Sequence, residues 1–234
     1  MKAKIIDKKE IAVGTLMVTY KVEEAFEFRA GQYFFITLPK LKYLDEKGGR
    51  RQFSIVNSPN EKGVLTMATR ISRSGFKKTL AELPFRTEIE VGPIAGAFVL
   101  PENLTRPLVF IAGGIGITPF MSMLRYVSEA KLPSNITLIY SSRNQQSTAF
   151  LTDLQKFSES IPNFKLILTM TDDNDWSGEK RMVDAKFIKE YTKDLENPYF
   201  MIVGPPLMTE AVVNEVRKIG ISDENVKIEK FTGY

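Results

Sequence analysis

The stretch LVFIAGGIGITP, residues 108–119, joins an apolar run to a glycine-rich turn and then to the start of an amphipathic segment. In this arrangement backbone amides can approach a pyrophosphate, and the N-terminus of the following helix can attract it. The spacing is G-x-G-x-x-P, so Pro119 stands where the usual dinucleotide-binding pattern has a third glycine. Proline suits a first helical position, where its missing N–H is not needed. The turn alone leaves two interpretations open, a nucleotide site and a tight turn without a ligand.

Downstream of this turn, short apolar segments alternate with longer amphipathic ones. Strands are expected at 108–112, 136–140, 165–170, 199–203 and 226–231, and helices at 118–130, 148–160, 183–195 and 206–220. This alternation predicts a parallel sheet covered by helices.

Upstream of residue 101 the pattern is that of an all-β domain. Stretches rich in Val, Ile, Phe, Tyr and Thr are separated by Gly, Pro and Asn turns, at 5–12, 15–20, 32–38, 52–57, 64–71 and 87–92. Their spacing predicts an antiparallel barrel or sandwich, interrupted by one short helix at about 76–83 that Pro84 ends. Because Pro101 and Pro107 flank a polar link, we expect a β-domain at 1–101 and an α/β domain at 107–234.

The composition restricts the chemistry. The 234 residues include no Cys and no His, which excludes thiolate nucleophiles, disulfides, iron–sulfur ligation and triads with an imidazole base. No metal site is expected. A bound organic cofactor, or carboxylates and hydroxyls, must therefore supply any chemistry.

The charge is unevenly distributed. Residues 1–101 hold 17 Lys and Arg against 11 Asp and Glu, whereas the rest holds 15 against 17. This excess is compatible with ordinary surface variation or with docking of an acidic partner. No basic run with interleaved aromatic residues suggests nucleic acid. The start MKAKIIDKKE lacks the apolar region of a secretory signal and no apolar run is long enough to cross a bilayer, so a cytoplasmic location is expected.

Two segments of the β-domain carry candidate binding residues. In RQFS, residues 51–54, strand alternation places Arg51 and Phe53 on one face, where they could clamp a phosphate and cover a ring. In SGFKKTL, residues 74–80, a Ser-Gly pair precedes a short helix with two lysines, which suits an anion at a helix N-terminus. Taken singly, Phe53 suits a core position equally well, and the lysines suit a solvated face.

Four motifs in order resemble those of the ferredoxin–NADP reductase superfamily of flavoenzymes. They are RQFS (51–54) for R-x-[YF]-[ST], GGIGITP (113–119) for G-x-G-x-x-P, VGPPLM (203–208) for C-G-P-x-x-M, and EKF (229–231) for E-x-F. The resemblance implies a six-stranded antiparallel FAD-binding barrel followed by an NAD(P)-binding parallel-sheet domain. Val203 replaces the family's Cys, so a thiol near the hydride path is missing. Without cysteines the chain corresponds to the stand-alone form that lacks an iron–sulfur domain.

The resemblance also implies roles for individual residues. Arg51 would pair with the flavin pyrophosphate, Phe53 would lie against the flavin, and Ser54 would hydrogen-bond near N5. An arginine fork suits a diphosphate, which favours FAD over FMN. The other implied FAD-binding residues are Gln52, Thr69, Arg70, Ser74, Lys77, Lys78 and Thr79. The implied nucleotide-binding residues are Gly114, Gly116, Thr118, Ser142, Arg143, Gly204, Pro205 and Met208. Phe231 would cover the flavin face that the nicotinamide must reach, with Tyr234 as a rival, so Ser54 and Phe231 are the catalytic candidates.

The implied activity is hydride transfer from NADPH or NADH to FAD, with electrons passed to a separate acceptor such as an acidic ferredoxin, a flavodoxin or an oxygenase. The protein's part is positioning rather than acid–base catalysis, which a chain without His can perform. Two alternatives stay open, a flavin reductase that uses free flavin and an accessory electron-transfer subunit. After the strand at 136–140, the segment from Ser141 to Arg143 offers hydroxyls and an Arg, and no acid occurs before Asp153. These groups suit a 2′-phosphate and favour NADPH slightly over NADH.

Overall fold

The computed structural model describes residues 1–232, which group into two compact units. One unit comprises Met1–Leu100 together with Thr118–Tyr126. The other comprises Pro101–Ile117 and the residues from Val127 onward.

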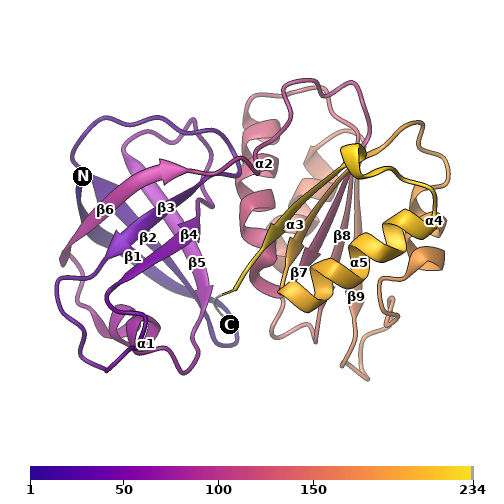
Figure 1. The fold of residues 1–234 in the computed structure, drawn as a ribbon. Coiled ribbons are helices and arrows are strands. Elements are labelled where there is room, and N and C mark those ends of the chain that lie inside the picture. Colours follow the sequence, from indigo (N-terminus) through magenta and orange to yellow (C-terminus); the bar gives the residue numbers. More distant parts are fainter. Residues whose placement is uncertain (233–234) are drawn as a thin grey trace. The chain divides into compact units, whose positions relative to one another are not determined.

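The first unit is built on a six-stranded antiparallel sheet, as the sequence predicts (Figure 1). Its strands are β1 (Lys2–Ala12), β2 (Thr15–Val22), β3 (Tyr33–Thr37), β4 (Arg50–Ser54), β5 (Val64–Arg70) and β6 (Glu88–Ala95), in the order β4-β3-β6-β1-β2-β5. Beyond the end of β4, the Val56 amide donates to the Thr66 carbonyl of β5 at 2.8 Å. This bond brings the two edges of the sheet together and curls it into a barrel.

The barrel core follows from the period-2 alternation of its strands. Phe34 and Ile36 of β3 and Tyr20 of β2 are fully buried, and the Tyr20 and Phe34 rings meet edge to face at 6.1 Å. The helix α1 (Gly75–Glu82) lies within one residue of its expected position. It is capped by Ser74, and it adds Phe76 and Leu80, one turn apart, to the same core.

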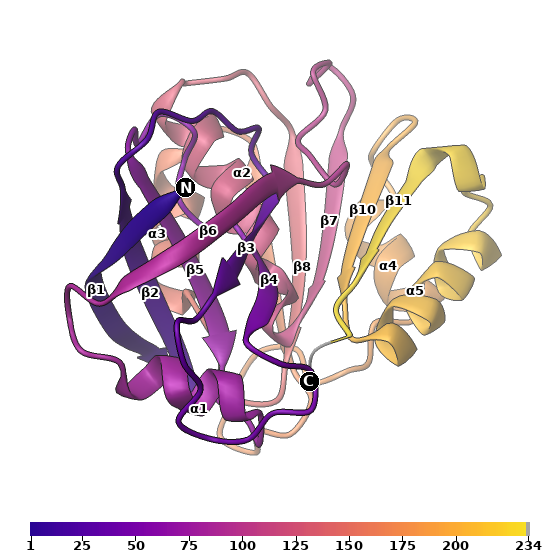
Figure 2. The same cartoon turned by 60° about the vertical axis from the view of Figure 1, so that its left-hand side comes forward.

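The second unit contains a five-stranded parallel sheet, which confirms the prediction for this half of the chain (Figure 2). Its strands are β7 (Leu108–Gly113), β8 (Ile136–Ser142), β9 (Phe164–Met170), β10 (Tyr199–Gly204) and β11 (Val226–Lys230), in the order β11-β10-β7-β8-β9. The helices of this half of the sequence are α2 (Thr118–Glu129), α3 (Leu151–Ser160), α4 (Ala185–Thr192) and α5 (Pro206–Lys218). Short 3-10 turns, η1 (Gly114–Ile117) and η2 (Asp223–Asn225), precede α2 and β11.

The strand order of this sheet reverses between β7 and β10. The chain proceeds from β7 to β8 and β9, then returns to the other side of β7 to form β10 and β11. Ligands of open parallel sheets bind at such a switch point, outside the carboxyl ends of the strands. The turns after β7 and β10 both lie at this place.

One face of the parallel sheet is covered by α4 and α5, which lie side by side in Figure 2. Val109, Ile111 and Ile202 of the strands pack with Phe187 of α4 and Val216 of α5 in one buried cluster. Within residues 1–232, no helix combines the length and apolar character needed to cross a bilayer.

The helix α3 begins three residues later than its amphipathic pattern suggests. Thr148 Oγ1 donates to the Asn144 carbonyl at 2.7 Å, and Phe150 adopts a left-handed conformation with φ 60°. These features form a turn that uses the residues expected to start the helix, which therefore starts at Leu151.

Candidate functional site

In the first unit, a carboxylate joins two of the implied FAD-binding residues. Asp45 accepts hydrogen bonds from Ser74 Oγ at 2.7 Å and from the Phe76 amide at 2.9 Å, and it forms an ion pair with the Arg51 guanidinium. The Asp45 side chain is 7% exposed and that of Arg51 is 17% exposed. The Phe76 amide first, and Ser74 next, hold the pKa of Asp45 well below its usual range. We call Asp45, Arg51, Ser74 and the first turn of α1 the anion cluster.

Arg51 is fixed in the anion cluster by the segment that precedes β4. Its Nη1 donates to the carbonyls of Lys47 at 2.7 Å and Gly48 at 2.9 Å, while Nη2 faces Asp45. The guanidinium carbon also lies 5.3 Å from the centre of the Phe76 ring. An Arg held this way presents a fixed fork of donors, which suits a phosphate or carboxylate.

Positive charge exceeds negative charge at the anion cluster. Burial first, and the nearby cations Arg51 and Lys47 next, lower the pKa of Lys77 to about 8, whereas Asp45 opposes them. Lys78 is exposed, although it was expected to contribute with Lys77. The cluster therefore has more cationic charge than the single carboxylate neutralises.

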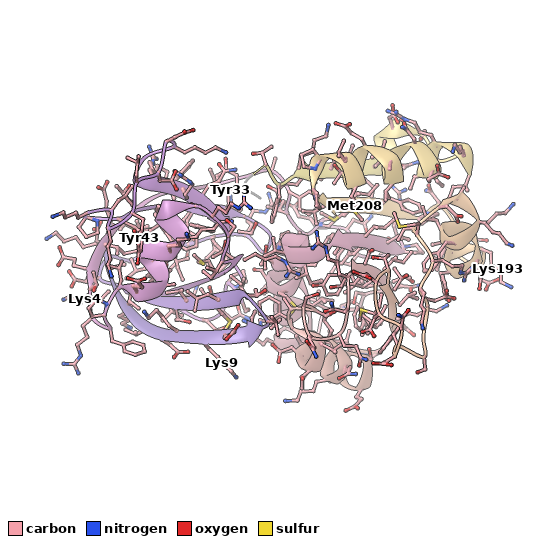
Figure 3. All side chains as sticks on the ribbon, turned by 90° about the horizontal axis from the view of Figure 1, so that it is seen from below. Lys4, Lys9, Tyr33, Tyr43, Lys193 and Met208 are labelled. Atoms are coloured by element: carbon pink, nitrogen blue, oxygen red, sulfur yellow. The ribbon has the colours of Figure 1, made fainter. Side chains whose placement is uncertain are left out.

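The other implied FAD-binding residues lie on the barrel strands and on α1. Thr79 is buried, and its Oγ1 accepts hydrogen bonds from the amides of Lys42 at 3.1 Å and Tyr43 at 3.4 Å (Tyr43 is labelled in Figure 3). Phe53 lies 5.9 Å from Phe76 between ring centres and packs against the barrel core. The remaining four are Gln52 and Ser54, on β4, and Thr69 and Arg70, at the end of β5.

In the second unit, the glycine-rich turn after β7 packs closely on the turn after β10. A Cβ atom on Gly116 would lie 2.7 Å from the Val203 carbonyl oxygen and 2.9 Å from the Gly204 Cα. Gly114 differs, because its φ is +53° and an added Cβ would meet nothing within 4 Å. Of the two glycines, Gly116 thus faces the protein's own backbone and Gly114 faces open space.

The segment after β10 forms the other side of this packing. Met208 Sδ would lie 3.0 Å from a Cβ on Gly204, and Met208 is labelled in Figure 3. The Gly204 carbonyl accepts a hydrogen bond from the Phe231 amide at 2.9 Å, which ties the end of β11 to the same place. Pro205 follows Gly204 and is the N-cap residue of α5.

Three further nucleotide-site candidates have different surroundings. Thr118 is buried at the start of α2. At the end of β8, the Ser142 Oγ atom is buried and has no hydrogen-bond partner within residues 1–232. The next residue, Arg143, is exposed. Tyr234, the rival of Phe231, lies outside the described residues.

Comparison with known proteins relates these features to a family. A family model described as "Oxidoreductase NAD-binding domain" matches residues 110–214. Reductase component 1 of terephthalate 1,2-dioxygenase from Comamonas sp is 26% identical over 223 residues, which cover 94% of this chain and 64% of the relative. The solved structure of a ferredoxin NADP+ reductase from Neisseria gonorrhoeae with bound FAD and NADP has a TM-score of 0.83 at 20% identity, covering 98% of both chains. The cytochrome P450 reductase GcoB from Amycolatopsis has a TM-score of 0.85 at 24% identity, covering 99% of this chain and 70% of that one.

Residues 110–214 thus match the NAD-binding domain family of oxidoreductases, and the chain has the same fold as the ferredoxin NADP+ reductase. The antiparallel barrel and the parallel sheet, seen in each unit separately, agree with this fold. The chain spans 49% to 64% of the length of the first curated relatives that it matches.

Among the motifs that resemble those of the ferredoxin–NADP reductase superfamily, E-x-F contains a carboxyl group to which the sequence analysis assigned no role. Glu229 lies beside Val203 in the β10–β11 register, and its Oε2 atom is buried without a hydrogen-bond partner in the described part of the chain. Burial raises the pKa of Glu229 to about 7. Its place in a motif within a predicted strand could have identified Glu229 as a candidate, but only the structure shows that its side chain is buried.

We expect Glu229 to make the stability of the chain depend on pH. Its pKa is about 7 in the folded chain against an ordinary 4.5, so the folded state holds a proton that the unfolded state has lost between these values. The contribution of Glu229 to the free energy of unfolding should therefore be complete below pH 4.5 and fall by about 3 kcal/mol as the pH rises past 7. Urea denaturation of Glu229→Gln at pH 5 and pH 8 should show that the decrease in the free energy of unfolding that is due to Glu229 is absent. Glu196→Gln, an exposed substitution, should retain it.

Proposed function

We propose that this chain is an NAD(P)H-dependent oxidoreductase that binds FAD on residues 1–101 and NAD(P)H on residues 107–234. Electrons then pass to a separate acceptor. The anion cluster is the observation that carries the flavin half of this proposal. Its Arg fork, Ser hydroxyl and helix amide already hold one anionic group, the Asp45 carboxylate, and the surrounding cations exceed it in charge. This donor set fits a diphosphate.

The nucleotide half of the proposal is supported by the family match and by the sheet. The NAD-binding family model spans the turn after β7 and the turn after β10. These turns meet at the switch point of a parallel sheet, where Gly114 leaves open space. A nucleotide pyrophosphate would lie against the amides of this turn.

Each residue of the proposed site has a binding or orienting task. Arg51, Ser74 and Lys77 would hold the pyrophosphate of FAD, while Phe53 and Ser54 of β4 would orient the ring system. Bound FAD supplies the capacity to take up two electrons as hydride and to release them singly. On the nucleotide side, Gly114 would admit the pyrophosphate, and Met208 and Phe231 would border the nicotinamide. Since the chemistry belongs to the cofactors, the task of the chain is to set their distance and angle.

The acceptor is proposed to be a protein. The Comamonas relative is named as the reductase component of a dioxygenase, and the Amycolatopsis neighbour as a cytochrome P450 reductase. An oxygenase component or a small electron carrier is the corresponding acceptor class here. An excess of basic residues in the first 101 positions suits an acidic partner.

The test of the proposed function has two steps. The purified chain should first bind FAD, which fluorescence quenching would detect. Anaerobic mixing of the flavin-loaded protein with NADH or NADPH should then bleach the visible absorbance of the flavin. Failure to bind any flavin would refute the flavin half. Binding without bleaching would instead support an accessory electron-transfer subunit.

Arg143 is proposed to read the 2′ position of the nucleotide. Arg143→Glu should raise the KM for NADPH more than that for NADH and shift the preference by about 1 to 3 kcal/mol, because a charged phosphate contact is lost. Lys186→Glu is a matched control, since it makes the same change of charge at an exposed position of α4. Equal effects of Arg143→Glu on both nucleotides would exclude this role.

A further inference from the structure

Asp45 uses the same hydrogen-bond donors that the proposed pyrophosphate site requires. The Phe76 amide has one hydrogen, which points to Asp45 at 2.9 Å, and the single hydroxyl hydrogen of Ser74 points to Asp45 at 2.7 Å. The Nη2 atom of Arg51 also faces Asp45. A phosphate oxygen cannot take these donors while Asp45 keeps them.

The segment that carries Asp45 is fastened along α1. At the last turn of α1, Glu82 accepts hydrogen bonds from Lys42 Nζ at 2.5 Å and from Tyr43 OH at 2.6 Å. At the first turn, the Tyr43 carbonyl oxygen would lie 2.7 Å from a Cβ on Gly75, and the Leu44 carbonyl oxygen would lie closer still. Residues 42–45 thus follow the helix from its end to its start, which brings Asp45 to the helix N-terminus.

The positive charge at the anion cluster favours an anion that carries more negative charge than one carboxylate. Arg51 and Lys47 act on Lys77 as like charges, and the Asp45 carboxylate opposes them. A diphosphate group brings two negative charges to these cations, whereas Asp45 brings one. The site can therefore exchange one anion for the other.

We propose that Asp45 is an internal competitor of the flavin pyrophosphate and sets the affinity of the chain for FAD. This inference rests on the proposed function. FAD binding displaces the Asp45 carboxylate from Ser74, Phe76 and Arg51, and the free energy of those contacts is subtracted from the binding free energy. The apparent dissociation constant rises by the inverse of the fraction of molecules in which the donors are available. Asp45 thereby makes the cofactor exchangeable, which favours turnover of flavin over permanent retention.

The test compares Asp45→Asn with the wild type. The Asn carbonyl can still accept from the Phe76 amide, so the local fold is kept, but the charge that holds Arg51 is lost. Titration with FAD, with fluorescence quenching as the readout, should show that FAD binds about tenfold more tightly to Asp45→Asn than to the wild type. The thermal midpoint of the protein without flavin should fall, because the internal ion pair is missing. Glu46→Gln is the matched control, since it removes a charge from an adjacent exposed residue and should change neither quantity.

Weaker or unchanged FAD binding by Asp45→Asn would overturn the inference, because it would show that Asp45 supports the site rather than competes for it. The thermal midpoint, measured with and without inorganic pyrophosphate, separates this outcome from failure of the proposed function. If FAD binds to neither protein but pyrophosphate stabilises Asp45→Asn more than the wild type, the flavin assignment fails and the competition stands. If pyrophosphate also has no effect on either protein, the competition is refuted.

Discussion

Arg51→Ala is expected to bind FAD about 10- to 100-fold more weakly than the wild type, since a bidentate charge-assisted contact of about 1.5 to 3 kcal/mol is lost. Arg51 is mostly buried and held by the Lys47 and Gly48 carbonyls, so its fork is already oriented for an anion. Preorganisation makes the contact stronger than that of a free surface Arg, because little rotamer entropy remains to be lost.

Dialysis of flavin-loaded Arg51→Ala followed by absorbance measurement would check this expectation. Arg50→Ala is the matched control on the same strand, because Arg50 is exposed and stacks on the Phe35 ring with its guanidinium carbon 4.3 Å from the ring centre. The control should retain flavin. Arg51→Lys keeps the charge but not the fork, and should fall between the two. Retention of stoichiometric FAD by Arg51→Ala would refute the placing of the pyrophosphate in the anion cluster.

The fold was predictable because local periodicity and burial agree along most of the chain. Barrel strands such as β3 alternate, with Phe34 and Ile36 buried, and the parallel sheet contains continuous apolar runs such as β7. The start of α3 was not predictable in the same way. Phe150 is a left-handed aromatic residue, a conformation that depends on tertiary packing and has no sequence signal.

Only those residues of the candidate site that belong to recognisable motifs could be predicted from the sequence. The sequence indicated Arg51 and Ser74, but Asp45 lies in a segment without periodicity and reaches Ser74 and Phe76 from about 30 positions away in the chain. Likewise, the spacing G-x-G-x-x-P treats its two glycines alike. Only the structure distinguishes Gly116, which packs on β10, from Gly114, which faces open space.

This difference between the glycines leads to a second large effect, at Gly116. Gly116→Val would place a branched side chain against the Val203 carbonyl and the Gly204 Cα, and both of these are backbone atoms of β10. Backbone of a central strand cannot move away cheaply, so the variant should lose about 2 to 3 kcal/mol of stability through overpacking. The same displacement would move the turn after β7 and abolish flavin reduction by NAD(P)H. FAD should remain bound, because the anion cluster lies in the first unit.

Gly114→Ala shows whether the loss in Gly116→Val comes from packing or from nucleotide access. Its Cβ meets no atom within 4 Å, so the cost to stability is limited to the left-handed backbone, about 1 kcal/mol. A nucleotide that passes over Gly114 would nevertheless meet the new methyl group, and the KM for NAD(P)H should rise while the thermal midpoint changes little. Urea denaturation and stopped-flow flavin bleaching measure the two quantities separately, and dithionite should bleach the flavin in both variants. A normal KM in Gly114→Ala would place the nucleotide elsewhere, and a fully stable Gly116→Val would contradict the close approach of the turn after β7 to β10.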